Sequence, residues 1–159
     1  MKVDLKSKDE LARMRRRTVG VVYQFFNLIP ELNIRDNVTL PTELDGDEPD
    51  EERLQTILTT VGLSGREQDF PSALSGGQRQ RAAIARALYA SPSLLLADEP
   101  TGNLDKETSQ EILDLLDRLN REHGITLVVV THSPTVAARM GRVITLHEGC
   151  VTGDERHEA

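Results

Sequence analysis

Apolar residues occur along this chain both as short continuous runs and as stripes with helical spacing. A run at residues 19–23 predicts a strand that ends at Gln24. Further on, an amphipathic helix that stops at Gly62 is predicted by four residues spaced i, i+3, i+4 and i+7. These are Leu54, Ile57, Leu58 and Val61.

The second half of the chain alternates helices with strands. An alanine-rich helix is predicted at residues 76–90, followed by an apolar strand at residues 94–97. Asp105 is a suitable cap for a helix that Gly124 ends, and residues 125–130 form the next apolar run. Because neither strand alternates apolar with polar residues, we expect both to be buried on both faces.

The order strand, helix, strand predicts an α/β fold with a parallel sheet. A terminal hairpin is predicted at residues 143–151, with its turn at Glu148 and Gly149. Acidic residues, glycine and proline dominate residues 43–52, which predicts an exposed loop. Ser7 and Glu10 have capping-box spacing and predict a helix that reaches Arg17.

Composition limits the classes of function. The chain has 159 residues, which fits one domain, and its net charge of −7 with only 3% aromatic residues argues against nucleic acid as a partner. Cys150 is the single cysteine, so neither an intrachain disulfide nor a thiolate metal cluster can form. No apolar run approaches the roughly 20 residues of a membrane span, so we expect a soluble chain that reaches membranes through a partner.

Residues 74–78 read LSGGQ at the start of the alanine-rich helix. Ser75 is a good N-cap, and Gly76 and Gly77 would let a phosphate approach the backbone N–H groups at the positive end of the helix dipole, next to Gln78. The alternative is a glycine-rich turn that only opens a helix. The odds of a chance LSGGQ in a chain of this length are on the order of 10⁻⁴, which favours a phosphate site.

Two carboxylates, Asp98 and Glu99, follow the strand at residues 94–97, where open α/β sheets bind ligands. Side chains alternate along a strand, so one carboxylate can serve Mg²⁺ while its neighbour reaches a water molecule. The alternative is a solvated acidic pair that opens a loop. His132 follows the next strand and is expected near Glu99, although a lone histidine there is more often a structural hydrogen-bonding group.

Together these residues resemble the nucleotide-binding subunit of an ABC transporter, from about residue 7 to about residue 153. The resemblance implies a P-loop NTPase-like (RecA-like) parallel sheet with an inserted α-helical signature subdomain at about residues 25–90, a core at about residues 91–153 and a tail at residues 154–159. Six motifs carry it in the family's order. They are Gln24 (Q-loop), residues 74–78 (signature), residues 94–98 (Walker B), Glu99 (catalytic base), Asp105 (D-loop) and His132 (switch histidine).

Two sequence segments are similar to those of the family branch that powers lipoprotein release and macrolide export. They are YQFFNLIPELNIRDNV and ADEPTGNLD. The resemblance implies ATP and Mg²⁺ as cofactors, a membrane permease as partner and a position on the cytoplasmic face of the cell membrane. Gln24 and Asp98 would hold Mg²⁺, and His132 would contact the γ-phosphate. In the family's head-to-tail dimer, the signature of one subunit (here Ser75, Gly76, Gly77 and Gln78) and its D-loop (here Asp105) face the nucleotide of the other.

One family motif does not occur in residues 1–159: no glycine is followed by lysine, so the P-loop pattern G-x-x-x-x-G-K-[ST] is missing. We therefore expect an N-terminally truncated cassette that is marginally stable, and a homodimer that does not hydrolyse ATP. Two alternatives to an ATP-hydrolysing subunit stay open. The chain is a non-catalytic partner that donates its signature to a complete paralogue, or an inactive truncated product.

Overall fold

The computed structural model describes residues 11, 12, 15 and 17–157. Most of the helix predicted from Ser7 onward lies outside the described residues. The chain divides into two compact units, Met1–Val129 and Val130–Ala159, which are described separately. Within the described part of the chain, no helix combines the length and the apolar character that crossing a bilayer requires.

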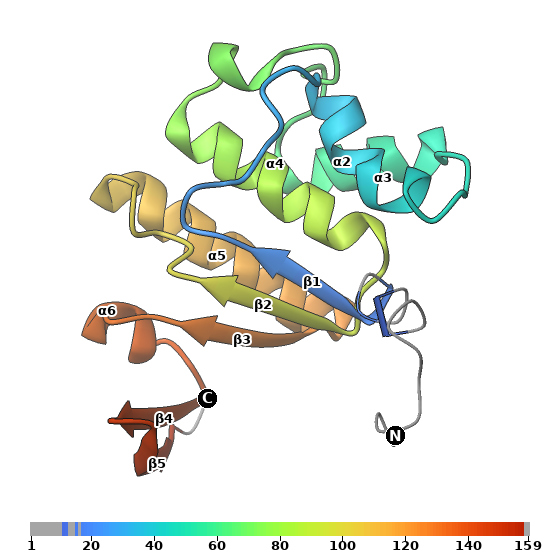
Figure 1. The fold of residues 1–159 in the computed structure, drawn as a ribbon. Coiled ribbons are helices and arrows are strands. Elements are labelled where there is room, and N and C mark those ends of the chain that lie inside the picture. Colours follow the sequence, from blue (N-terminus) through green and yellow to red (C-terminus); the bar gives the residue numbers. More distant parts are fainter. Residues whose placement is uncertain (1–10, 13–14, 16, 158–159) are drawn as a thin grey trace. The chain divides into compact units, whose positions relative to one another are not determined.

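The first unit is built on a three-stranded sheet with the order β1-β2-β3 (Figure 1). The strands are β1 (Val19–Val22), β2 (Leu94–Asp98) and β3 (Thr126–Val130). β1 and β2 are parallel, with Val19 opposite Leu94, and the three arrows in Figure 1 point the same way. The predicted parallel α/β sheet is therefore confirmed.

Helices α2, α3 and α4 gather on one side of this sheet, and α5 runs behind its strands (Figure 1). Two predicted helix ends are confirmed, because Gly62 and Gly124 have left-handed φ values of 76° and 64° and act as C-caps. The elements are α2 (Ile34–Glu43), α3 (Glu51–Val61), the 3₁₀ helix η1 (Pro71–Ala73), α4 (Gly76–Tyr89) and α5 (Lys106–His123).

Helix α2 was not predicted from the apolar pattern. Asn33 caps it by accepting a hydrogen bond of 2.8 Å from the Asp36 backbone N–H. Pro41 lies inside the helix, where proline normally removes a hydrogen bond and breaks the pattern. Packing against α4 stabilises the helix despite this proline, since the side chains of Ile34 and Val38 are fully buried.

One face of the sheet is covered by helices. Val22, Leu95 and Ala97 are buried on this face, and α4 approaches it closely at Gly20. A Cβ atom on Gly20 would lie only 2.6 Å from the carbonyl oxygen of Ala87, so glycine is needed for this helix to pack on β1. The core of the first unit therefore lies between the sheet and α4 and α5.

The prediction that the strand at residues 125–130 is buried on both faces was wrong. Leu127 and Val129 pack against the core, but Val128 and Val130 are 43% and 60% exposed. The reason is position: β3 is at the end of the described three-stranded sheet, and its second face has no covering helix among the described residues of the first unit. A continuous apolar run does not distinguish an edge strand from a central one.

A buried tyrosine ties α4 to the start of α3. The Tyr89 hydroxyl accepts a hydrogen bond of 2.8 Å from the Asp50 N–H and donates one of 3.1 Å to the Asp50 carbonyl oxygen. The guanidinium of Arg53 lies 5.4 Å from the centre of the Tyr89 ring. Together these contacts hold the end of the exposed acidic segment, at the start of α3, against α4.

We expect Tyr89→Phe to lower the free energy of unfolding by about 1 kcal/mol, because it removes the two hydrogen bonds of the Tyr89 hydroxyl. The loss stays this small because water replaces the lost partner at the exposed Asp50. Urea unfolding followed by circular dichroism measures this change. Tyr23→Phe is the matched control at an exposed tyrosine and should change stability by less than about 0.5 kcal/mol. Equal effects in the two variants would contradict the role of the Tyr89 hydroxyl.

The second unit contains the short helix α6 (Pro134–Ala137) and an antiparallel hairpin of β4 (Arg142–His147) and β5 (Cys150–Arg156). The predicted hairpin is confirmed. Its turn has positive φ values of 50° and 76° at Glu148 and Gly149, as a two-residue type I′ turn requires. An ion pair of 2.7 Å between Arg142 and Asp154 joins the two strands.

Candidate functional site

The carboxyl ends of β1 and β2 place three predicted site residues at one edge of the sheet. The strands run parallel, with Val22 opposite Ala97, so Gln24 follows β1 beside the point where β2 ends. Asp98 is exposed at the end of β2, and Glu99 is half-buried just beyond it. This edge can present an amide and two carboxylates to one ligand.

Glu99 has a left-handed φ of 46°, which is uncommon for a residue with a side chain. A turn closes behind it, with a hydrogen bond of 3.0 Å from the Gly102 N–H to the Glu99 carbonyl oxygen. Gln80 of α4 donates a second hydrogen bond of 2.8 Å to the carbonyl oxygen of Pro100. These contacts maintain a backbone conformation that turns the chain sharply at the carboxylate.

Gln80 is a residue that the sequence analysis did not identify. Its side chain is 0% exposed, and it links the alanine-rich helix to the turn after Glu99. A buried amide nitrogen requires an acceptor, so the bond from the Gln80 Nε2 indicates a fixed link between the two motifs. The only signal in the sequence was its place two residues after LSGGQ.

The turn at residues 75–78, here called the signature turn, forms a complete capping box. The Ser75 Oγ accepts a hydrogen bond of 3.3 Å from the Gln78 N–H, and the Gln78 Oε1 accepts one of 2.9 Å from the Ser75 N–H. The prediction that Ser75 caps the helix is confirmed. The hydroxyl hydrogen of Ser75 remains available as a donor at the positive end of α4.

The glycines of the signature turn pack against the start of α5. A Cβ atom on Gly77 would lie 2.4 Å from Cγ2 of Thr108, and one on Gly76 would lie 3.3 Å from Cδ2 of Leu104. The sequence analysis gave the glycines a role in phosphate approach only. The structure adds a second reason, because the close packing of α4 and α5 leaves no room for a side chain at Gly77.

Asp105 caps α5 as predicted. Thr108 donates to it twice, from its hydroxyl to Oδ2 at 2.6 Å and from its N–H to Oδ1 at 3.0 Å. These bonds, most of all the one from the hydroxyl, hold the pKa of the Asp105 carboxyl below its ordinary value. A carboxyl with a lowered pKa favours folding above its unfolded-state pKa, and this contribution is lost as the pH falls through its folded-state pKa.

We therefore expect Asp105→Asn to be less stable than the parent chain at pH 7, with a difference that closes as the pH is lowered below about 4. Urea unfolding at a series of pH values measures this difference. Glu122→Gln, at an exposed glutamate near the end of α5, is the control for the loss of one negative charge and should change the stability at pH 7 by less than about 0.5 kcal/mol. A constant difference for Asp105→Asn across the series would contradict the assignment.

His132 belongs to the second unit and is the second residue after the end of β3. Its side chain is exposed, and the neighbouring Ser133 N–H donates to the Thr131 Oγ1 at 3.0 Å. Ser133 also caps α6. The placement of His132 near Glu99 stays a prediction.

The donor set at the edge of the sheet fits Mg²⁺. No group of three or more His, Cys, Asp or Glu side chains that could hold a metal occurs among the described residues. Mg²⁺ needs no such group when a nucleotide is present, because it usually takes one or two protein ligands together with phosphate oxygens and water. The carboxylate of Asp98 and the amide oxygen of Gln24 are ligands of this kind.

One hollow of the first unit lies away from this edge. It measures about 420 Å³ and is lined by Arg53, Ile57, Leu88 and His123 together with Ser91 and Pro92, which precede β2. It therefore lies at the amino end of β2, whereas Asp98 is at the carboxyl end. Its walls include no predicted site residue, so this hollow is separate from the candidate site.

Comparisons with known proteins agree with the motifs. Residues 2–102 match the model of the ABC transporter family. The chain is 53% identical over 154 residues to the macrolide export ATP-binding/permease protein MacB of Rhodopirellula baltica, covering 94% of this chain and 22% of that protein. It is 51% identical over 142 residues to the lipoprotein-releasing system ATP-binding protein LolD of Syntrophus aciditrophicus, covering 88% of this chain and 64% of that protein. The chain thus spans less than two thirds of these relatives.

Solved structures agree on the fold. A dimeric structure of a post-hydrolysis state of the ATP-binding cassette MJ0796, bound to ADP and Pi, matches the whole of this chain with a TM-score of 0.85 and 41% sequence identity. The chain covers 71% of that cassette. A second dimeric structure of MJ0796, described as a bacterial ABC transporter cassette, matches with a TM-score of 0.84.

Proposed function

We propose a function for this chain from one premise: it belongs to the ABC transporter family. It is the ATP-binding part of a transporter of the LolD and MacB type. We propose that it couples ATP hydrolysis to transport or extraction by a membrane permease. In this proposal it lies on the cytoplasmic face of the membrane and pairs head to tail with a second nucleotide-binding subunit.

One observation carries the proposal. The parallel register of β1 and β2 brings Gln24, Asp98 and Glu99 to one edge of the sheet, and Gln80 links the turn after Glu99 to the helix that begins at the signature turn. The register supports a common site for these three residues, and the Gln80 bond supports a link between the Glu99 turn and the signature helix. A ligand at this edge would meet metal ligands and a general base together.

Each residue has a chemical role in this proposal. Mg²⁺, when bound with ATP, neutralises phosphate charge, and Asp98 and the Gln24 amide oxygen would hold it. Glu99 accepts a proton from the water that attacks the γ-phosphorus, so that ADP and inorganic phosphate are the products. His132 contacts the γ-phosphate through a ring N–H.

The signature turn would act on a nucleotide held by the other subunit. The hydroxyl hydrogen of Ser75 and the N–H groups of Gly76 and Gly77 would supply donors at the positive end of α4, which suits a terminal phosphate. Asp105 caps the adjacent α5 and faces the same partner. In this proposal the nucleotide is enclosed only when two polypeptides meet.

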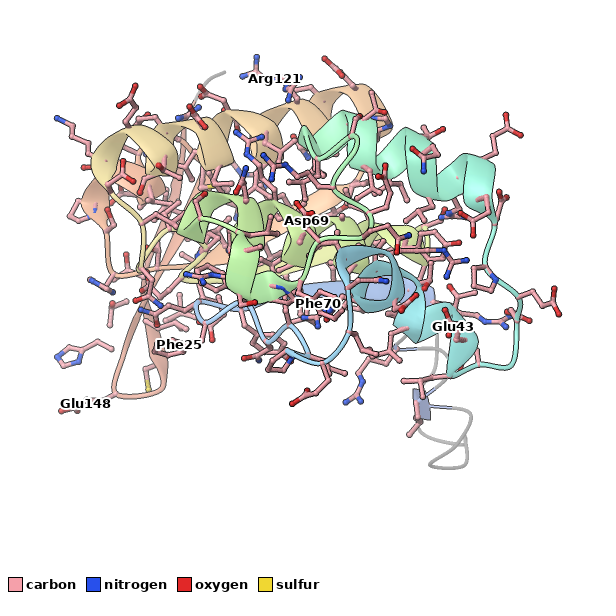
Figure 2. All side chains as sticks on the ribbon, turned by 90° about the horizontal axis from the view of Figure 1, so that it is seen from above. Phe25, Glu43, Asp69, Phe70, Arg121 and Glu148 are labelled. Atoms are coloured by element: carbon pink, nitrogen blue, oxygen red, sulfur yellow. The ribbon has the colours of Figure 1, made fainter. Side chains whose placement is uncertain are left out.

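We propose that exposed apolar side chains near the turn after β1 mark a surface for the permease. Phe25 is 72% exposed and Phe70 is 47% exposed, and both lie on the side turned away from Arg121 of α5 (Figure 2). Large exposed apolar side chains are typical of protein contacts when they gather on one side. Tyr23 and Ile29, on either side of Phe25 in the sequence, are 42% and 36% exposed.

Joining the chain to the upstream, P-loop-bearing segment of a LolD-type relative tests the proposal. We expect the joined protein to hydrolyse MgATP and the chain of residues 1–159 to show no turnover by itself, because the P-loop supplies the phosphate cradle. Phosphate release measures the rate. A joined protein that folds and binds MgATP without hydrolysing it would contradict the assignment.

A second candidate function is supported by the intact signature turn in a sequence without the P-loop pattern. In this case the chain is non-catalytic and completes the site of a complete paralogue. Mixing the two should raise ATP turnover, and Ser75→Arg should abolish the rise because arginine fills the space of the phosphate. No response in either mixture would favour the third possibility, an inactive truncated product.

A further inference from the structure

The turn that follows β1 has an unusual backbone conformation. Phe26 and Asn27 have successive left-handed φ values of 64° and 50°. Such values typically cost about 1–3 kcal/mol for a residue with a side chain, so surrounding contacts must hold them. Within the turn, the Phe26 N–H donates to the Tyr23 carbonyl oxygen at 3.2 Å. The Asn27 N–H donates to the Phe25 carbonyl oxygen at 2.6 Å, and further contacts come from α4 and from the segment after Glu99.

Arg86 of α4 anchors the far end of this turn. Its Nη1 donates to the Asn27 carbonyl oxygen at 2.5 Å and its Nη2 donates to the Phe26 carbonyl oxygen at 3.0 Å. Arg86 is half-buried, and this partial burial lowers the pKa of its guanidinium. The guanidinium of Arg79 lies 5.4 Å from the centre of the Phe26 ring. The strained part of the turn is therefore fixed to the signature helix.

Asn103 is hydrogen-bonded to Gln24 at the near end of the turn. Its Nδ2 donates to the Gln24 backbone carbonyl oxygen at 3.0 Å, and the Gln24 Nε2 donates to the Asn103 Oδ1 at 3.5 Å. Gly102 closes the space beside it, since a Cβ there would lie 2.7 Å from the Gln24 Nε2. Gly102 and Asn103 thus confine the Gln24 side chain from one side. These two residues are here called the clamp.

The two bonds together determine the orientation of the Gln24 amide. A backbone carbonyl oxygen can only accept, so the Asn103 atom that faces it must be the nitrogen. The Asn103 oxygen then faces the Gln24 side chain and can also only accept, so Gln24 must present its Nε2 there. This leaves the Gln24 Oε1 outside the clamp. The order of donors and acceptors along this chain of bonds favours this orientation over the flipped amide.

We propose that Asn103 is a positioning residue for Gln24: it holds the side-chain amide so that the oxygen, and not the NH₂ group, is available to a cation. The inference rests on the proposed function, in which Gln24 binds Mg²⁺. A flipped amide would direct hydrogens at the metal, and Mg²⁺ is bound through oxygen. Asn103 acts through Gln24 and does not itself touch the nucleotide.

The side-chain amide of Gln24 in the nucleotide-free chain provides the test. In a ¹⁵N-labelled sample its NH₂ resonances are identified by their loss in Gln24→Ala. We expect these protons to exchange with water at least about threefold more slowly than those of Gln55, which is exposed on α3. Asn103→Ala should raise the exchange rate of Gln24 to that of Gln55. An unchanged rate in Asn103→Ala would overturn the proposal.

Two further variants separate positioning from general stability. Asn120→Ala is the matched control, because Asn120 also donates to a backbone carbonyl oxygen, that of Ile125 at 2.8 Å, but on the far end of α5. It should leave the Gln24 exchange rate unchanged. Gly102→Ala should displace the Gln24 amide by direct contact and shift its resonances while Asn103 is intact. Absence of any shift in Gly102→Ala would also count against the clamp.

Cleavage by chymotrypsin shows whether an effect is local. Phe25 lies within the clamped turn and Phe70 outside it, and both are exposed (Figure 2). Asn103→Ala should accelerate cleavage after Phe25 by at least about threefold and leave cleavage after Phe70 unchanged. Equal acceleration at both sites would show a general loss of structure and would overturn the positioning role.

These measurements contain no nucleotide, so the two proposals can fail separately. An unprotected Gln24 amide in the parent chain rejects the clamp and leaves the ATPase proposal standing. A protected amide in a P-loop-joined protein that binds MgATP without hydrolysing it rejects the ATPase proposal and leaves the clamp standing.

Discussion

Replacing Glu99 with glutamine is expected to reduce the ATP turnover of the P-loop-joined protein by about 10²–10⁴-fold, the usual contribution of a general base. The change removes the proton acceptor but keeps the size and the left-handed backbone of the residue. The melting temperature and the affinity for MgATP should therefore remain close to those of the parent. Phosphate release and a thermal melt measure the two properties.

Glu122→Gln is the control for this prediction. It makes the same chemical change at an exposed glutamate of α5, remote from the end of β2. Its turnover should equal that of the parent. If Glu99→Gln retained full turnover, or lost turnover only in proportion to a loss of folded protein, Glu99 would not be the base.

Gly77→Ala is expected to destabilise the chain by about 1–3 kcal/mol, the usual cost of forcing a methyl group into a packed contact. The new Cβ would lie 2.4 Å from Cγ2 of Thr108, and Thr108 is held by its hydrogen bond to Asp105. In a helix without this contact the same change is normally favourable by up to about 1 kcal/mol. The sign of the effect therefore tests the packing of α4 on α5.

Thr108→Ser offers a rescue that isolates the cause. Serine lacks only the Cγ2 methyl and keeps the oxygen, which would lie 4.0 Å from the new Cβ. The double variant should recover most of the stability lost in Gly77→Ala, so the two changes should be strongly non-additive. Gly141→Ala, with nothing within 4 Å of its new Cβ, should be nearly neutral. Additive effects of the two changes would contradict the packing account.

Local sequence signals predicted most of the fold. Caps and stops are short-range features, and Ser75, Asp105, Gly62 and Gly124 each begin or end a helix as predicted. Burial of whole strands was less predictable, because it depends on which elements lie beside a strand. The run at residues 125–130 forms a strand as predicted, but Val128 and Val130 are exposed on its uncovered face. Helix α2 was missed because Pro41 interrupts the signal.

The motifs of the site could be read from the sequence, but the contacts that hold them could not. Gln80, Arg86, Asn103 and Thr108 are polar residues at positions that suit a solvated helix face or a loop equally well. Their partners are 20, 60, 79 and 3 residues distant along the chain. Only the last lies within reach of a local pattern, so the long-range links required coordinates.

A structure of this chain assembled with a complete cassette of its family and a non-hydrolysable ATP analogue tests the central claim most directly. The account predicts that the Ser75 hydroxyl and the backbone N–H groups of Gly76 and Gly77 lie about 3 Å from oxygens of the γ-phosphate bound by the partner. It would be contradicted by an assembly in which the signature turn points away from the triphosphate.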